Sequence, residues 1–144
     1  MATAADITRR IFQAYNDRDL DGMLASVNPD VRITLPGGQL ISGKEEMSAH
    51  EQQEWEGFPD AHVEVRQVID QGSMAVAEYI WAATNTGPLN LPDGSTLPAT
   101  GKRIELPCVT VVEVKDGLVA AERSYWDMME AFQQMGLLPA TATA

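Results

Sequence analysis

The hydrophobic residues at the start of the chain recur at helical spacing. They form two sets, separated by the polar turn 16–19: Ile7, Ile11, Ala14 and Tyr15, then Leu20, Met23, Leu24 and Val27. Apolar residues three to four positions apart are typical of amphipathic helices. We therefore expect two short helices that pack as a pair and end at Asn28 and Pro29. A strand through residues 31–35 should follow, ending at the Pro-Gly-Gly turn 36–38.

A third helix is predicted from residue 42 to about residue 57. Ser42 and Glu45 have the spacing of a capping box, in which two side chains satisfy amides at a helix start. The surface of this helix is mostly Glu and Gln, and its apolar residues are few: Met47, Ala49 and Trp55. Such a helix has a weak buried face, so we expect it on the outside or the rim of the domain.

Beyond residue 60 the hydrophobic period changes to two, which is typical of half-buried strands. One alternating set follows the Phe-Pro-Asp segment 58–60: Val63, Val65, Gln67 and Ile69. After the turn 70–73, the return strand 74–84 is apolar on both faces except at Glu78. A strand that is apolar on both sides is usually covered on both sides.

The last third of the chain predicts a loop, a hairpin and a closing helix. Residues 85–100 are rich in Gly, Pro and Asn, so we expect a long loop or irregular hairpin end near one mouth of the domain. Strands are predicted at 103–114 and 118–125, joined by a tight turn. The last helix should run from Asp127 to Gly136.

This order of elements predicts an α+β fold. Sequential strands joined by turns make a mostly antiparallel sheet, and a long twisted sheet curls into a cone around a pocket. We expect three to four helices on its concave face and rim. The 144 residues fit one domain, with a core at about 7–138 and a flexible tail at 139–144.

Charge and composition exclude several classes of function. A net charge of −11 argues against partners such as nucleic acid or an anionic membrane. Cys108, His50 and His62 are too few and too scattered for a metal site, so we expect no metal. The sequence shows neither a signal peptide nor an apolar run of membrane-spanning length, which predicts a cytoplasmic protein.

Asp127 is the first candidate for chemistry, because it follows Tyr125 and Trp126 and precedes the last helix. Apolar walls raise the pKa of a carboxyl group, and a carboxyl that titrates near neutrality serves as general acid and base. Asp127 also has the spacing of a capping box with Glu130, and the residue types alone favour that role. Both interpretations stay open, and they are compatible because a carboxylate has two oxygens.

Four other side chains are candidates for contact with a substrate, each with a structural alternative. Glu78 either points inward and orients a substrate or pairs across the strands with Arg66. His50 on the rim helix is either solvated or a second acid/base group at the pocket mouth. Trp55 and Trp81 belong either to a pocket wall or to core and interface packing.

Several short segments, taken together, resemble a known family. They are AYNDRDLD at 14–21, FPD at 58–60, TGKRIE at 100–105, DG at 116–117, and YWD at 125–127 followed by Gly136. Their order and spacing resemble the SnoaL-like polyketide cyclases of the nuclear transport factor 2-like, cystatin-like superfamily. The resemblance covers roughly residues 7–138.

The resemblance implies a hydrophobic pocket, a homodimer or higher homo-oligomer, and no cofactor. It implies that Asp127 is the general acid/base in an intramolecular aldol-type cyclisation, or a related proton transfer, of a small apolar carbonyl or polycyclic substrate. Thr110 stands where we expect an imidazole in the cyclases, and with Tyr125 it completes the candidate substrate contacts. Two alternatives stay open: a non-catalytic small-molecule-binding module, or epoxide hydrolase-type water activation by Asp127 and Glu78.

Overall fold

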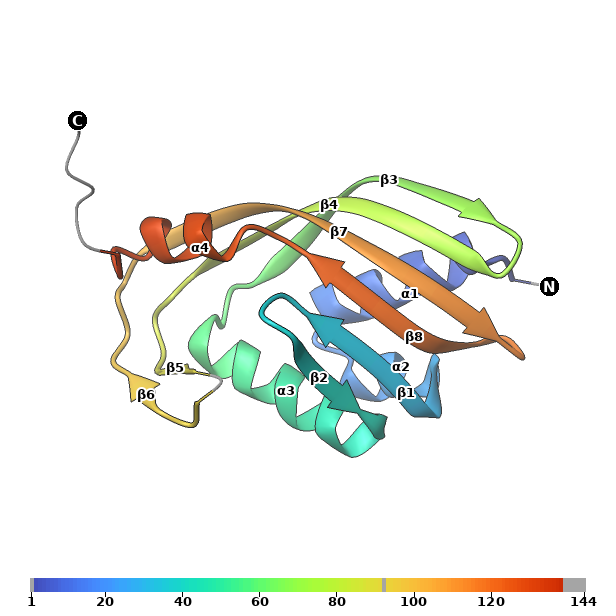
Figure 1. Ribbon diagram of the computed structural model, residues 1–144, viewed down its shortest axis with the longest axis horizontal. Coiled ribbons are helices and arrows are strands. Elements are labelled where there is room, and N and C mark those ends of the chain that lie inside the picture. The colour runs from blue at the N-terminus through green and yellow to red at the C-terminus, as the bar shows by residue number, and fades with distance from the viewer. Residues whose placement is uncertain (1, 92, 139–144) are drawn as a thin grey trace.

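One curved sheet carries its main helices on a single face (Figure 1). The computed structural model describes residues 2–91 and 93–138. The helices are α1 (Ala4–Asn16), α2 (Leu20–Ala25), α3 (Gly43–Gly57) and α4 (Met128–Gln134). The strands of the main sheet are β1 (Val27–Leu35), β2 (Gln39–Ser42), β3 (His62–Gln71), β4 (Met74–Thr84), β7 (Arg103–Lys115) and β8 (Leu118–Tyr125). The tail predicted at 139–144 lies outside the described residues.

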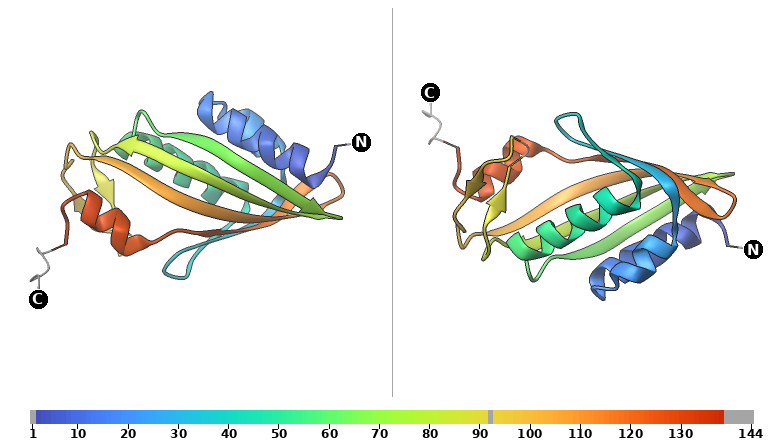
Figure 2. Two further views of the ribbon diagram at one scale, coloured as in Figure 1. Left: turned by 90° about the horizontal axis from the view of Figure 1, so that it is seen from above. Right: turned by 90° about the horizontal axis from the view of Figure 1, so that it is seen from below.

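The sheet has the order β2-β1-β8-β7-β4-β3 and is antiparallel except where β1 pairs with β8. Hairpins connect β3 to β4 and β7 to β8, so the long strands are neighbours in sequence and in space. Seen from above and below, the sheet is strongly twisted, and α1 and α3 lie on the same side of it (Figure 2). The predicted α+β fold with a curved, mostly antiparallel sheet is confirmed.

Alternation along β4 and β7 separates an inner from an outer sheet face. The two strands pair from Met74–Glu113 to Thr84–Arg103 without a break in register. Tyr79 and Cys108, directly opposite each other, are both buried beneath the helices. Because side chains alternate along a strand, their sequence neighbours point to the outer face.

A β-bulge in β3 overturns one part of the predicted alternation. The register with β4 shifts between Val65 and Gln67, so the residues after the shift change face. Ile69, predicted to share a face with Val65, is therefore 60% exposed on the outer face, while Val68 packs against the core. Period-two reasoning assigned Ile69 to the wrong side because it assumes an unbroken strand.

The first strand begins earlier than the sequence predicts. Val27, which was assigned to the second helix, is fully buried at the start of β1 and pairs with Val119. The register shifts between Val27 and Arg32, which accommodates Pro29 and its missing N–H. The structure also adds β2, which the sequence analysis did not predict.

The predicted capping box of α3 is wrong in its partners. Ser42 is the N-cap residue, but its side chain makes no capping hydrogen bond. Gly43 has a φ of 83°, so the chain turns between Ser42 and the regular helix. The backbone N–H of Ser42 donates instead to Oε2 of Glu46 at 2.6 Å, which moves the acidic partner from Glu45 to Glu46.

Asn85 anchors the segment 85–101 to the end of α3. Its side-chain amide donates to the carbonyl oxygens of Gly57 and Gly87, and its Oδ1 accepts from the backbone N–H and hydroxyl of Thr100. Asn85 is fully buried, and four partners satisfy its polar atoms. Within this segment β5 (Leu89–Asn90) pairs with β6 (Thr96–Leu97), so the predicted irregular hairpin is confirmed.

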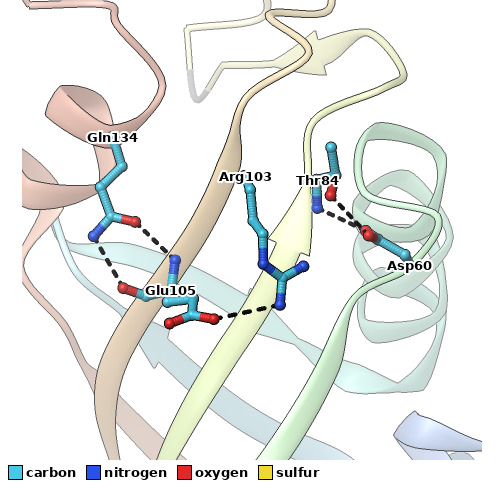
Figure 3. A network of polar contacts seen from close by, with 5 residues as sticks. All are labelled: Asp60, Thr84, Arg103, Glu105 and Gln134. Atoms are coloured by element: carbon cyan, nitrogen blue, oxygen red, sulfur yellow. Dashed lines mark hydrogen bonds and ion pairs between the residues drawn. The ribbon is translucent and has the colours of Figure 1, made fainter.

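Side chains complete the backbone pairing where the strands of the main sheet run out (Figure 3). β8 ends at Tyr125, opposite Val109, so the first residues of β7 extend beyond it. There the Gln134 side chain of α4 takes the place of β8: it accepts from the N–H of Glu105 at 2.7 Å and donates to the carbonyl of Glu105 at 2.9 Å. Asp60 accepts from the N–H and hydroxyl of Thr84 at 2.6 and 2.8 Å. These contacts fix the ends of β4 and β7.

In the part of the chain that the structure describes, no helix is long and apolar enough to cross a membrane.

Candidate functional site

A cavity of about 340 Å³ lies between the inner sheet face and the helices. Its walls come from α1, α3, α4, the segment 88–91 and the inner positions of β4, β7 and β8. Most of the lining is apolar, with aromatic rings from several elements: Phe12, Tyr15, Phe58, Tyr79, Trp81 and Trp126. A cavity of this size and character is typical of small-molecule sites.

Helix α3, predicted to lie on the outside or the rim of the domain, contributes a row of polar groups to this cavity. Met47, His50, Glu51 and Glu54 follow one another at spacings of three, one and three residues, so they share one helix face. All four line the cavity. The Glu-rich composition therefore marks one wall of the site as well as the solvent-facing side of the helix.

A chain of hydrogen bonds holds Glu54 in place. The hydroxyl of Tyr15 on α1 donates to Oε2 of Glu54 at 2.6 Å, and the indole Nε1 of Trp81 on β4 donates to the same hydroxyl at 2.9 Å. Burial and the charge of Glu54 raise the pKa of Tyr15 well above its usual range, so the phenol keeps its proton. Tyr15 therefore acts as a permanent donor to Glu54.

The carboxyl group of Glu54 titrates near neutrality. Burial is the largest cause, the charge of Glu51 adds to it, and together they raise the pKa of Glu54 to about 7. The charge of His50 and the hydrogen bond from Tyr15 favour the ionised form, but they do not outweigh burial. Glu54 is thus divided between its two protonation states at physiological pH.

Glu122 on β8 is a second carboxyl group of the same kind. It lies opposite Val112 in the pairing with β7, and Ser124 follows on the same face. Burial raises the pKa of Glu122 to about 7, and the charge of Glu51 contributes. The charge of Glu51 therefore raises the pKa of Glu54 on its own helix and the pKa of Glu122 on the sheet.

His50 is the basic member of this group. Burial alone lowers the pKa of its imidazole, but the neighbouring carboxyl groups of Glu51 and Glu54 outweigh burial and raise it. Its Nδ1 lies 3.8 Å from Oε1 of Glu51, the separation of an ion pair and too long for a hydrogen bond. Within the described residues, Nδ1 of His50 and Oε2 of Glu51 are buried without a hydrogen-bond partner.

Hydroxyl groups connect three strands across the cavity floor. The Tyr79 hydroxyl lies 2.8 Å from Oγ1 of Thr110, which lies 2.9 Å from Oγ of Ser124. Burial raises the pKa of Tyr79, and burial likewise raises the pKa of the Cys108 thiol to about 12, so both stay protonated. This row supplies neutral hydrogen-bonding groups beside Glu122.

The structure brings three of the predicted substrate contacts to the cavity and leaves three outside its lining. His50, Trp81 and Thr110 line it. Among the described residues, Trp55 lies outside the lining and packs on Tyr15 and Arg18. The other two, Glu78 and Tyr125, are exposed on the outer face of the sheet, away from the cavity. Glu78 accepts a hydrogen bond from Gln67 instead of pairing with Arg66, and Tyr125 is 56% exposed.

Asp127 lies at the N-terminus of α4, where its Oδ1 accepts from the N–H groups of Met129 and Glu130. It is exposed and is not among the described residues that line the cavity. The predicted capping role is confirmed. The predicted catalytic role stays a prediction.

Four residues of the cavity were not predicted as site residues, although the sequence carries two signals for members of this set: Glu51, Glu54, Glu122 and Tyr15. The helical spacing of 47, 50, 51 and 54 gathers titratable groups beside an apolar residue. The alternation of β8 assigns Glu122 to the face of Ser124 and Trp126. No local pattern pairs Tyr15 with Glu54, because the contact joins residues 39 positions apart.

The described residues contain no group of three or more potential ligands that could hold a metal ion.

The raised pKa of Glu122 predicts how stability depends on pH. An acid that titrates at about 7 when folded and at 4.5 when unfolded destabilises the fold increasingly as pH rises through that window. Glu122→Gln should therefore raise the free energy of unfolding more at pH 8 than at pH 5, by on the order of 1–3 kcal/mol. Urea unfolding at the two pH values measures the difference.

The matched control is Glu45→Gln, which removes the same charge at an exposed position of α3. It should change stability equally at pH 5 and pH 8. An equal effect of Glu122→Gln at both pH values would contradict the assignment of a raised pKa to this group.

Solved structures share this fold. A candidate SnoaL-like polyketide cyclase from Jannaschia sp. CCS1 is 24% identical, with 94% of this chain and 93% of that chain covered and a TM-score of 0.82. IdmH, a candidate polyketide cyclase from Streptomyces antibioticus, is 21% identical over 94% and 99%, with a TM-score of 0.78. AclR, a candidate hydroxylase from Streptomyces galilaeus, is 20% identical over 94% and 97%, with a TM-score of 0.77.

At these identities the likeness shows the fold alone, and proteins given different activities share it. A search among curated proteins finds no match. The family model described as the SnoaL-like domain matches residues 8–122, which is most of the chain. The protein therefore belongs to the SnoaL-like domain family.

Proposed function

We propose that the protein is an enzyme that moves protons on a small, largely apolar carbonyl compound, as in an intramolecular aldol-type cyclisation. The observation that carries this proposal is the presence of two carboxyl groups, Glu54 and Glu122, that titrate near 7 on two walls of one apolar cavity. Acids and bases work best when their pKa lies near the working pH. Because both pKa values lie near 7, the protonated and the ionised form of each group are both populated at that pH.

The chemistry needs one carboxylate and one carboxylic acid. The carboxylate takes a proton from the carbon beside the carbonyl, the electron pair of that C–H bond forms the C=C bond of an enol, and the carboxylic acid gives its proton to the carbonyl oxygen. The enol carbon then attacks a second carbonyl carbon of the same molecule to close a ring: the enol O–H proton returns to the carboxylate that gave it, the first C=O bond re-forms, and the other group, now a carboxylic acid, gives its proton to the oxygen of the second carbonyl as that C=O π bond breaks. The apolar walls favour these steps because they exclude competing water.

Positioning supports Glu54 as one of the two groups. Tyr15 holds one oxygen of Glu54 through the 2.6 Å hydrogen bond, and Trp81 fixes Tyr15 in turn. This leaves Oε1 of Glu54 as the oxygen that is free to meet a substrate. Thr110 and Ser124 offer hydroxyl groups to the oxygen atoms of the substrate from the floor.

Asp127 is the second candidate for the acid/base role, on the strength of its position in the YWD segment. Its Oδ1 accepts hydrogen bonds from two helix amides, whereas its Oδ2 has no such role. For Asp127 to act, its exposed carboxylate would have to meet the substrate at the α4 end of the cavity.

Proton exchange tests the proposal without knowledge of the natural substrate. The protein should accelerate exchange of the protons beside the carbonyl of 2-tetralone for deuterium in D2O, which ¹H NMR measures. Glu54→Gln and Glu122→Gln should each reduce the catalysed rate about 100-fold or more, the usual effect of losing a general acid or base. The rate should be highest near pH 7, where one group is ionised and the other protonated.

The same assay separates the candidate acids. If Asp127→Asn abolishes exchange while both glutamine variants retain it, the acid/base role belongs to Asp127. If the ketone binds and no variant or wild-type protein exchanges its protons, the protein is a binding module and the proposed chemistry is wrong.

We also propose that the protein forms a homodimer through the outer face of its sheet. Apolar side chains lie side by side there, as the register shows: Ile69 beside Val76, Val76 beside Val111, and Val109 beside Tyr125. Ile69 and Tyr125 are 60% and 56% exposed in the single chain. Glu78 and Arg123 share this face, so it combines exposed apolar side chains with charged ones, and exposed apolar side chains grouped in this way mark a candidate interface.

Light scattering after size exclusion should give a mass twice that of one chain. Val76→Glu places a charge in the middle of the patch and should convert the dimer to a monomer, because an unpaired charge is costly in an interface. Ala99→Glu, an exposed position in the segment 85–101, adds the same charge away from the patch and should leave the dimer intact. A monomeric wild-type protein would contradict this interface.

A further inference from the structure

The cavity contains a surplus of negative charge. Three glutamates, Glu51, Glu54 and Glu122, line it together with one imidazole, His50. Among the described residues that line it, none is a lysine or an arginine. The site thus has acidic groups on two walls and no permanent positive charge of its own.

Arg18 does not supply a positive charge inside the cavity, although its charge lowers the pKa of Glu54. Its guanidinium carbon lies 5.3 Å from the centre of the Trp55 ring. Its N–H groups donate to the backbone carbonyls of Tyr15 and Pro59. Arg18 is therefore held behind the cavity wall by other partners and is not among the lining residues.

Two of the carboxyl groups have oxygens without a partner. Oε2 of Glu51 is buried and accepts no hydrogen bond from any described residue. Glu122 is half-buried on the inner face of the sheet and makes neither a hydrogen bond nor an ion pair within the described chain. Buried unpaired carboxylates are costly, and a positively charged partner relieves that cost.

The remaining walls suit an organic cation better than a metal ion. Aromatic faces attract ammonium groups, and Phe12, Phe58 and Trp81 line the same cavity. The carboxyl groups of the described residues are not gathered at metal-ligand spacing. The net charge of −11 also favours the approach of cations from solution.

We propose that the cavity takes a small, apolar compound that carries a positively charged amine, and that Glu51 and Glu122 bind the ammonium group. This inference rests on the proposed function, since it names the substrate class of the same site. The apolar ring system of the ligand would contact the aromatic walls, and its ammonium group would donate hydrogen bonds to the unpartnered oxygens.

Calorimetric titration with three compounds that share one ring system tests the charge preference. They are 2-aminotetralin, which is an ammonium ion at pH 7.5, the neutral 2-tetralol, and tetralin-2-carboxylate. The amine should bind at least about tenfold more tightly than the alcohol, as expected for hydrogen bonds to charged groups. The carboxylate should bind more weakly than either, because it repels the glutamates.

Proton linkage gives a second readout. The titratable groups that face the ammonium position are His50, Glu51 and Glu54 from α3, Glu122 from β8, Tyr15 from α1, Tyr79 from β4 and Cys108 from β7. The two tyrosines and the cysteine stay protonated. The ammonium should displace the proton from Glu122, which binds it, so amine affinity should rise between pH 5 and pH 8 while alcohol affinity does not. Glu54 does not bind the ammonium group and remains available as the carboxylic acid.

Glutamine variants locate the ammonium group. Glu51→Gln and Glu122→Gln should each remove most of the preference for the amine over the alcohol, while binding of the alcohol confirms an intact cavity. Glu45→Gln removes an exposed charge of α3 and should leave the preference unchanged. A preference that survives both cavity variants would overturn the assigned residues.

The outcomes separate this inference from the proposed function. If 2-tetralone is bound and exchanged but the amine binds no better than the alcohol, the cation preference is wrong and the proton chemistry stands. If the amine binds preferentially and the ketone is not exchanged, the cation preference stands and the proton chemistry is wrong. If none of the compounds binds, the inference is overturned.

Discussion

Glu51 repels the two carboxyl groups with which it shares the cavity, and burial makes this repulsion stronger. Its charge raises the pKa of Glu54 within α3 and of Glu122 on β8, in addition to the larger effect of burial. Charges interact more strongly where the surroundings are less polarisable than water. The proposed proton chemistry, the proposed preference for an amine and the predicted pH dependence of stability all depend on this one arrangement.

The fold makes the arrangement possible by giving each carboxyl group a rigid support. Glu122 belongs to the inner face of a strand that has neighbours on both sides, β7 and β1. Glu54 belongs to a helix and is tied to α1 and β4 by the hydrogen bonds of Tyr15 and Trp81. Asn85 fixes the segment 85–101 to the end of α3, so the wall at 88–91 is also held. Destabilised groups persist at functional sites when their surroundings fix them in this way.

Most of the fold was predictable from the sequence, and most of the site was not. The strand 74–84 and the hairpin of β7 and β8 follow from alternation and turn residues, and these elements have the predicted bounds to within one residue. The face of Ile69 was not predictable, because a bulge reverses the alternation without changing residue type. The cavity residues Tyr15, Glu54 and Glu122 come from three distant elements, so their meeting depends on packing that period and propensity do not encode. Asp127 was predicted to be catalytic because it follows Tyr125 and Trp126 at the start of a helix. The same position is that of a helix N-cap, which is the role that the structure shows.

Glu51 and burial together hold the pKa values of Glu54 and Glu122 near 7 in one cavity. A ¹³C NMR titration of the glutamate side-chain carboxyl groups tests this most directly, in the wild-type protein and in Glu51→Gln. Glu54 and Glu122 should titrate near pH 7 in the wild-type protein, and both pKa values should fall in the variant. Titration of both groups near 4.5, the ordinary value of a glutamate, or pKa values that do not respond to the loss of Glu51, would contradict it.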